Sequence, residues 1–337
     1  MIEQASGQQE QKPIGVIDAI SVGYRLLVHF WGIILIPILL DIFFWLGPQI
    51  SPWGAIQQLI TQAPPEFAQA FRETLGLSSG APAQWPTGPN VMTALVQLPG
   101  APTPLAGLLG TLPAPPGWTR VVWAPSSPWL LMGILALLLF AGAPITGFYL
   151  AMVARALYRL QDMPFSVWRR ALWATVQLVL LLIMGIALFI GLVLGLSVLM
   201  TLGLLIHPAL GMGLFGIATF LVSWLLVLAM VLFYFAPASL VLQRAHIFQA
   251  LSRSAVVVMR NSWSSFGFII IVFVISQGFA LIWHRLLTTL AGTLISIVGN
   301  AALTSGLAIA TMVFFHSRYT HLIKELQRLT SSSSSQE

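Results

Sequence analysis

The sequence has no cysteine and very few charged side chains. Of its 337 residues, 58% are hydrophobic and 7% are charged, against about 25% charged in an average soluble domain. The absence of cysteine excludes disulfides, thiolate chemistry and cysteine-ligated metal or iron–sulfur sites. The scarcity of charge excludes a soluble domain, and the high hydrophobicity excludes a disordered chain. The composition therefore indicates an integral membrane protein.

Long apolar runs predict an all-α fold, a polytopic membrane helix bundle with six transmembrane helices plus interfacial amphipathic helices. About 20 apolar residues cross a hydrocarbon core of ~30 Å. No Asp, Glu, Lys or Arg occurs from Ala171 to Gln243. That stretch is too long for one helix, so we predict a break at His207-Pro208. Its first part is long enough to begin as an in-plane helix. The predicted spans are 26–46, 129–153, 174–205, 212–236, 264–284 and 296–317.

Three regions are predicted along the chain. Residues 1–25 form an N-terminal cytoplasmic tail with an interfacial helix over 14–25, residues 26–318 form the membrane domain, and residues 319–337 form a cytoplasmic tail. The membrane domain contains an extracytoplasmic insert at 48–128, which holds 15 of the 21 prolines. Two interpretations of this insert stay open, an unstructured spacer or short helices on the outer membrane face. The candidate helices are 65–77, 91–98 and 105–112.

The basic residues predict the orientation. With the N-terminus inside, inside segments hold 12 of the 15 Lys and Arg residues, and outside segments hold Arg72, Arg120 and Arg285. Such an excess marks the cytoplasmic side of a membrane protein. We therefore expect a bacterial cytoplasmic (inner) membrane protein with both termini inside.

A weak internal repeat occurs three times. Basic entry segments at 18–31, 165–177 and 249–263 each lead into a span, and basic return segments follow at 147–160, 231–245 and 312–326. The first and third entries match only with a one-residue gap. The pattern favours three helical hairpins, each introduced by an interfacial helix. The alternative is that any basic-flanked membrane helix looks like this.

This layout, with the stretch QALSRSAVVVMRNSW at 249–263, resembles a known family. It is a poorly characterised six-helix bacterial inner-membrane family related to the membrane domain of some glycerophosphodiester phosphodiesterases. The resemblance covers the predicted spans but not the insert, and it implies a six-helix membrane domain. The catalytic domain of those phosphodiesterases has no counterpart here, so the resemblance implies no activity and no catalytic residues.

Asp41 and Asn300 are candidate functional polar residues inside predicted spans. Asp41 is the only acid in any predicted span, and an ionisable group at membrane depth is a functional hypothesis by default. It could carry a proton or bind a cation. Alternatively, it reaches the headgroups or pairs with Arg285. Asn300 is expected to hydrogen-bond a neighbouring helix.

Two further groups of residues suggest contacts. Small residues four apart let two helices approach closely, and packing within the chain is favoured over dimerisation for Ala187, Gly191 and Gly195. Basic clusters attract anionic headgroups or dock a cytoplasmic partner. The arginines concerned are Arg155, Arg159, Arg169, Arg170, Arg244, Arg253 and Arg260.

No pattern predicts a metal, cofactor or catalytic site. No HExxH motif is present, and no pair of the six histidines shares metal-ligand spacing with a carboxylate. We interpret the histidines as interfacial anchors. The glycines at 211–216 spell GxGxxG, but no strand precedes them and no acid follows at the required distance. We interpret them as a tight turn that opens the fourth span. No Walker A motif, Ser-His-Asp arrangement or carboxylate pair is present.

The sequence therefore favours a non-enzymatic accessory, assembly or lipid-organising component of the membrane. The alternative is a transporter or permease subunit for a hydrophobic or lipid-like substrate, and an intramembrane enzyme would need a second polar group near Asp41. The expected partners are membrane lipids. A protein partner could bind the outer insert or the inside arginine loops, and no nucleic acid is expected.

Overall fold

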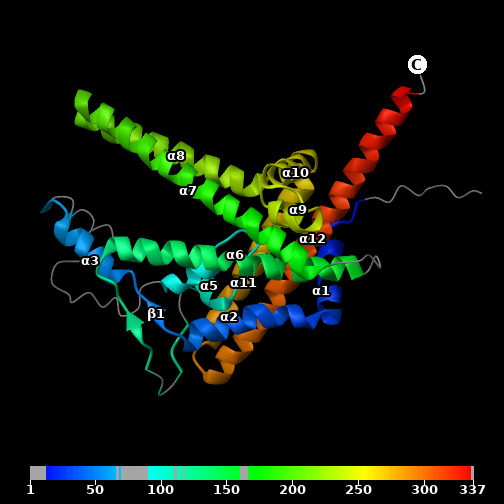
Figure 1. Cartoon of the computed structure of the whole chain (residues 1–337), viewed down its shortest axis with the longest axis horizontal. Helices are drawn as coiled ribbons and strands as arrows, with labels where there is room; N and C mark the ends of the chain where they lie inside the picture. The colour runs from blue at the N-terminus through cyan, green and yellow to red at the C-terminus, as the bar shows by residue number, and fades with distance from the viewer. Residues whose placement is uncertain are drawn as a thin grey trace, which may run out of the picture.

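A computed structural model describes residues 13–65, 68–69, 90–109, 112–115, 117, 119–159 and 166–334. The described chain is almost wholly helical, which confirms the all-α class (Figure 1). Two-residue strands β1 (Gln49–Ile50) and β2 (Val122–Trp123) pair in parallel. The helices are α1 (Val16–His29), η1 (Trp31–Ile34), α2 (Leu35–Leu46), α3 (Trp53–Gln62), η2 (Val91–Val96), α5 (Leu105–Leu109), α6 (Pro128–Arg159), α7 (Val167–Ile206), α8 (Pro208–Leu232), α9 (Ala236–Leu242), α10 (Ile247–Arg260), α11 (Ser262–Leu286) and α12 (Leu290–Ser334).

Five helices of the described chain are long and apolar enough to cross a membrane, or six if one bent pair counts as a single span. The protein is therefore a membrane protein. The bent pair corrects the predicted span at 26–46, because the chain turns by 93° between α1 and the helix over 31–46. Proline cannot donate to the carbonyl four residues earlier. Pro37 in the first turn of α2 thus fits the 3₁₀ geometry of η1 just before it.

The structure supports the internal repeat, and its helices align without the one-residue gap between the first and third entry segments. Helices α1, α7 and α10, which we call the entry helices, begin at equivalent residues. Each buries its eighth, eleventh and twelfth residue, and the eighth is always small. These buried residues are Gly23, Leu26 and Leu27 in α1, Ala174, Gln177 and Leu178 in α7, and Ser254, Val257 and Val258 in α10.

Each entry helix packs against the helix that closes the preceding repeat, and the first packs against the last. At Gly23 of α1, an added Cβ would lie 2.7 Å from the Ala310 nitrogen of α12. At Gly147 of α6, an added Cβ would lie 2.8 Å from the Ala171 oxygen of α7. The Ser254 hydroxyl of α10 donates to Leu232 O at the end of α8, at 2.7 Å. Helix α1 is thus a packed element of the bundle along α12, rather than only an interfacial helix.

The second repeat lacks the helix break of the other two. Helix α10, Asn261 and α11 together span 247–286, and α7 covers the same length of 40 residues in one continuous helix. The prediction that this run begins as a separate in-plane helix is therefore wrong. Because α7 runs straight, the hairpin of α7 and α8 projects away from the bundle (Figure 1). We call residues 183–206 of α7 together with α8 the arm.

The predicted break between the third and fourth spans is confirmed at His207, which separates α7 from α8. The GxGxxG glycines, however, lie inside α8 and form no turn. Gly211 allows the two arm helices to approach, since an added Cβ would lie 2.6 Å from the Leu204 nitrogen.

Candidate functional site: a loop clamped inside the bundle

Asp41 binds the backbone of the insert. It lies on α2 with no exposed surface. Its Oδ2 accepts a hydrogen bond from the Leu105 N–H and its Oδ1 accepts one from the Ala106 N–H, both at 2.9 Å. These two amides open the short helix α5, where helical N–H groups have no partner within the helix. The carboxylate therefore satisfies two buried donors that would otherwise be unpaired.

Asn300 binds the same segment from another helix. This side chain on α12 is fully buried, and its Nδ2 donates to Thr103 O at 3.0 Å. Asp41 and Asn300 are far apart in the sequence, yet both form hydrogen bonds with neighbouring residues of one loop. We call residues 90–109 the clamped loop. It comprises η2, the turn over 97–104, and α5.

The clamped loop lies deep inside the bundle. Gly142 of α6 faces Leu95 so closely that an added Cβ would collide with the Leu95 carbonyl oxygen. Farther along the loop, a Cβ on Gly100 would lie 3.1 Å from Leu150 of the same helix. Leu150 is eight residues beyond Gly142, which is about 12 Å along an α-helix. The predicted position of 91–98 and 105–112 on the outer membrane face is therefore wrong for the residues described.

The composition of the turn suits this depth. Irregular backbone at membrane depth is tolerated only where it is buried in protein or lines a water-filled cavity. Pro99, Pro102 and Pro104 carry no N–H, so this turn has fewer donors to satisfy. Gly100 has a φ of 77°, in the left-handed region that glycine enters without strain. The prolines and the glycine that suggested a surface loop thus also fit a buried turn.

The rest of the described insert is anchored at the end of α2. Asn90 Oδ1 accepts from the Ile50 and Met92 N–H groups, each at 3.1 Å. Trp45 Nε1 donates to Pro113 O at 2.9 Å, and Nη2 of Arg120 donates to Trp45 O at 3.0 Å. Burial lowers the pKa of Arg120. For the described part of the insert these contacts favour an ordered structure over a spacer. Most of the expected helix at 65–77 lies outside the described residues.

Sequence reasoning missed Asn90, although an Asn directly before a helix is an N-cap signal. It also offered pairing with Arg285 as one role for Asp41. That pairing does not form, since both carboxylate oxygens bind backbone amides and Arg285 is exposed.

Two of the predicted arginines stabilise helix ends. Arg170 Nη1 donates to Val241 O and Leu242 O, both at 2.8 Å, and its guanidinium lies 4.3 Å from the Tyr158 ring centroid. It thereby caps α9, whose last carbonyls lack helical partners. Arg253 Nη1 donates to Gln243 Oε1 at 2.8 Å. These contacts hold the ends of the repeats together.

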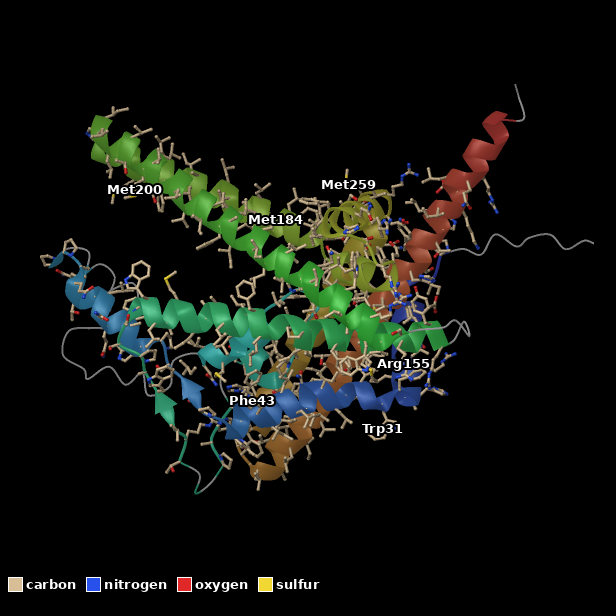
Figure 2. The ribbon with its side chains drawn as sticks, in the orientation of Figure 1. Trp31, Phe43, Arg155, Met184, Met200 and Met259 are labelled. Atoms are coloured by element: carbon tan, nitrogen blue, oxygen red, sulfur yellow. The ribbon has the colours of Figure 1, made fainter. Side chains whose placement is uncertain are left out.

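The other predicted arginines face outward or line a pocket. Arg169, Arg244 and Arg260 are exposed. Arg155 and Arg159 line an open pocket together with residues 29–33, at the bend between α1 and α2. Figure 2 shows Arg155 and Trp31 at the same end of the molecule.

The small-residue contact predicted for Ala187, Gly191 and Gly195 does not form within the described chain. All three lie exposed on the arm, and a Cβ added at Gly191 or Gly195 meets nothing within 4 Å. The close approach occurs instead between α1 and α12, at Gly23 and Ala310. Composition alone could not show which small residues form a close helix contact and which lie on an exposed surface.

No group of three or more metal-ligating side chains occurs among the residues described.

Comparison with known proteins gives a family without an assigned activity. Residues 68–325, more than half of the chain, match the family described as "Domain of unknown function (DUF7847)". No curated protein and no solved structure matches the chain. The resemblance to the phosphodiesterase-associated membrane domain stays a prediction.

Proposed function

We propose, from the premise that the chain belongs to this family of unknown function, that it is a non-enzymatic accessory, assembly or lipid-organising component of a membrane. The arm is the observation that carries this proposal. It contains no Asp, Glu, Lys or Arg, and most residues of α8 whose burial is described are exposed. Large apolar side chains such as Phe189 and Trp224 are 66% and 61% exposed. Such a surface suits lipid chains or another membrane helix.

The clamped loop supports this role over hydrophilic transport. A polar substrate needs polar groups near the bilayer midplane, where transporters place their binding sites. Asp41 uses both carboxylate oxygens on the loop backbone, and Asn300 donates to the same loop. The polar side chains that suggested transport therefore have a structural role in this proposal.

A photo-crosslinker placed on the arm tests the proposal. It would replace Phe189 or Trp224 in the full-length protein in native membranes, with a matched crosslinker at exposed Trp129 on α6 as the control. Mass spectrometry would then identify the adducts. We expect the arm positions to capture one membrane protein, or one lipid class enriched over the bulk membrane, and the control to capture bulk lipid. Identical, unselective adducts at all three positions would refute the proposed role of the arm.

A transporter or permease subunit for a lipid-like substrate is the second candidate. Repeated hairpins and irregular backbone inside a helix bundle are typical of transporters, and this chain has both. The test uses purified protein in liposomes that carry a fluorescent phospholipid, whose outer-leaflet pool is bleached by dithionite. Bleaching beyond half of the fluorescence, abolished in a folded Asp41→Asn variant, would establish transport. Bleaching that stops at the level of empty liposomes would exclude lipid translocation.

A further inference from the structure

We propose that the pocket at the bend between α1 and α2 binds the phosphate group of an anionic phospholipid. The pocket is lined by His29, Phe30, Trp31, Gly32 and Ile33 from the bend and by Met152, Arg155 and Arg159 from α6. The proposal concerns a different surface from the arm, so it does not rest on the proposed function.

Two guanidinium groups supply the charge. Arg155 and Arg159 are four residues apart on α6, which places them on the same helix face. Arg159 lies 5.7 Å from the Phe30 ring centroid, a cation–π contact that joins α6 to the bend. Within the described residues, neither guanidinium has a carboxylate partner. Arginine binds phosphate strongly because its planar fork donates two parallel hydrogen bonds.

Two half-buried arginines at this end of the bundle, Arg170 and Arg318, have structural partners instead. Arg170 binds the carbonyls that end α9. Arg318 donates from Nη2 to Ile14 O at 3.2 Å, and from Nη1 to Asn261 Oδ1 at 3.3 Å. Arg155 and Arg159 differ from these two arginines because they line an open pocket.

Apolar side chains beside the pocket favour a lipid over a soluble phosphate ester. Val28 is 75% exposed and Trp31 is 65% exposed. Tryptophan concentrates at membrane interfaces, where an apolar ring lies at headgroup level. Arg155 and Arg159 are also among the basic residues that predict the cytoplasmic side. A phosphate held by the arginines would therefore leave acyl chains beside exposed apolar side chains.

Gly32 offers a way to fill the pocket without disturbing the fold. It lines the pocket, and an added Cβ would meet nothing within 4 Å. A leucine there would occupy space that the ligand needs. Gly133 on α6 is equally unobstructed and does not line this pocket, so Gly133→Leu is the matched control.

The experiment is a native mass spectrometry titration of the full-length protein in detergent with phosphatidylglycerol and, separately, phosphatidylcholine. We expect the protein to bind phosphatidylglycerol more tightly than phosphatidylcholine. Arg155→Gln or Arg159→Gln should weaken phosphatidylglycerol binding about fivefold, which is the affinity that one basic residue contributes near anionic lipid. Gly32→Leu should also weaken binding, whereas Gly133→Leu and the exposed-arginine control Arg169→Gln should not.

Three outcomes would overturn the proposal. The first is equal binding of the two lipids by the unmodified protein. The second is undiminished phosphatidylglycerol binding by Gly32→Leu and by both arginine variants. The third is binding of free glycerol phosphate as tight as that of the lipid, which would assign the pocket to a soluble phosphate ester.

Discussion

Removing the Asp41 carboxylate should release the clamped loop. Asp41→Ala leaves the Leu105 and Ala106 N–H groups buried without an acceptor. Each unsatisfied buried donor costs about 1–3 kcal/mol, so we expect the free energy of unfolding to fall by about 2–6 kcal/mol. Asp41→Asn keeps one acceptor oxygen and places an amide NH₂ against the other donor. Its expected cost is about half as large.

Cysteine labelling can measure this loss locally, because the chain has no cysteine of its own. A single cysteine replacing Ala106, which is 2% exposed, should react slowly with a maleimide. Adding Asp41→Ala should raise the labelling rate about 30-fold or more, since 2 kcal/mol changes an opening equilibrium by that factor. Asp18→Ala, which removes an exposed acid on α1, is the control and should leave the rate nearly unchanged.

Two results would refute the clamp. One is unchanged labelling and unchanged stability in Asp41→Ala. The other is a fully stable Asp41→Asn variant that loses a proton-coupled flux in liposomes, which would make Asp41 a charge carrier. The two mechanisms therefore predict opposite outcomes for the same pair of variants.

The other predictions concern glycines at close contacts, each paired with an unobstructed glycine. Gly142→Leu should displace η2 from α6 because its Cβ would collide with the Leu95 carbonyl, whereas Gly133→Leu should leave thermal stability unchanged or slightly higher. Protease accessibility of the insert reports the difference, and equal digestion of the two variants would contradict it. Gly23→Leu should separate α1 from α12 and lower thermal stability in detergent, whereas Gly191→Leu meets no atom within 4 Å and should leave folding intact. Equal melting temperatures would show that this close approach contributes little.

The sequence predicted the helical class and the break at His207 because both depend on local composition. It also suggested the repeat, with a one-residue gap between the first and third entries. The buried faces of α1 and α10 align without that gap. Side-chain identity guided the sequence alignment, and helix packing depends on size and spacing.

The position of the insert could not be predicted in this way. The prolines and the glycine of the turn over 97–104 are typical of exposed turns, and composition does not reveal that a turn is buried. Asp41 and Asn300 were identified as unusual, but their shared partner is backbone, which leaves no pattern in the sequence. Only the fold brings Thr103, Leu105 and Ala106 between them.

The lengths of the apolar helices have a consequence for the surrounding bilayer. Helix α7 has 40 residues and is about 60 Å long, twice a hydrocarbon thickness of ~30 Å. To stay within that thickness its axis would lean about 60° from the bilayer normal, beyond the ~40° upper end of observed tilts. The helix over Trp31–Leu46 is only about 24 Å long. The two lengths therefore predict a bilayer that is thicker beside α7 than beside α2.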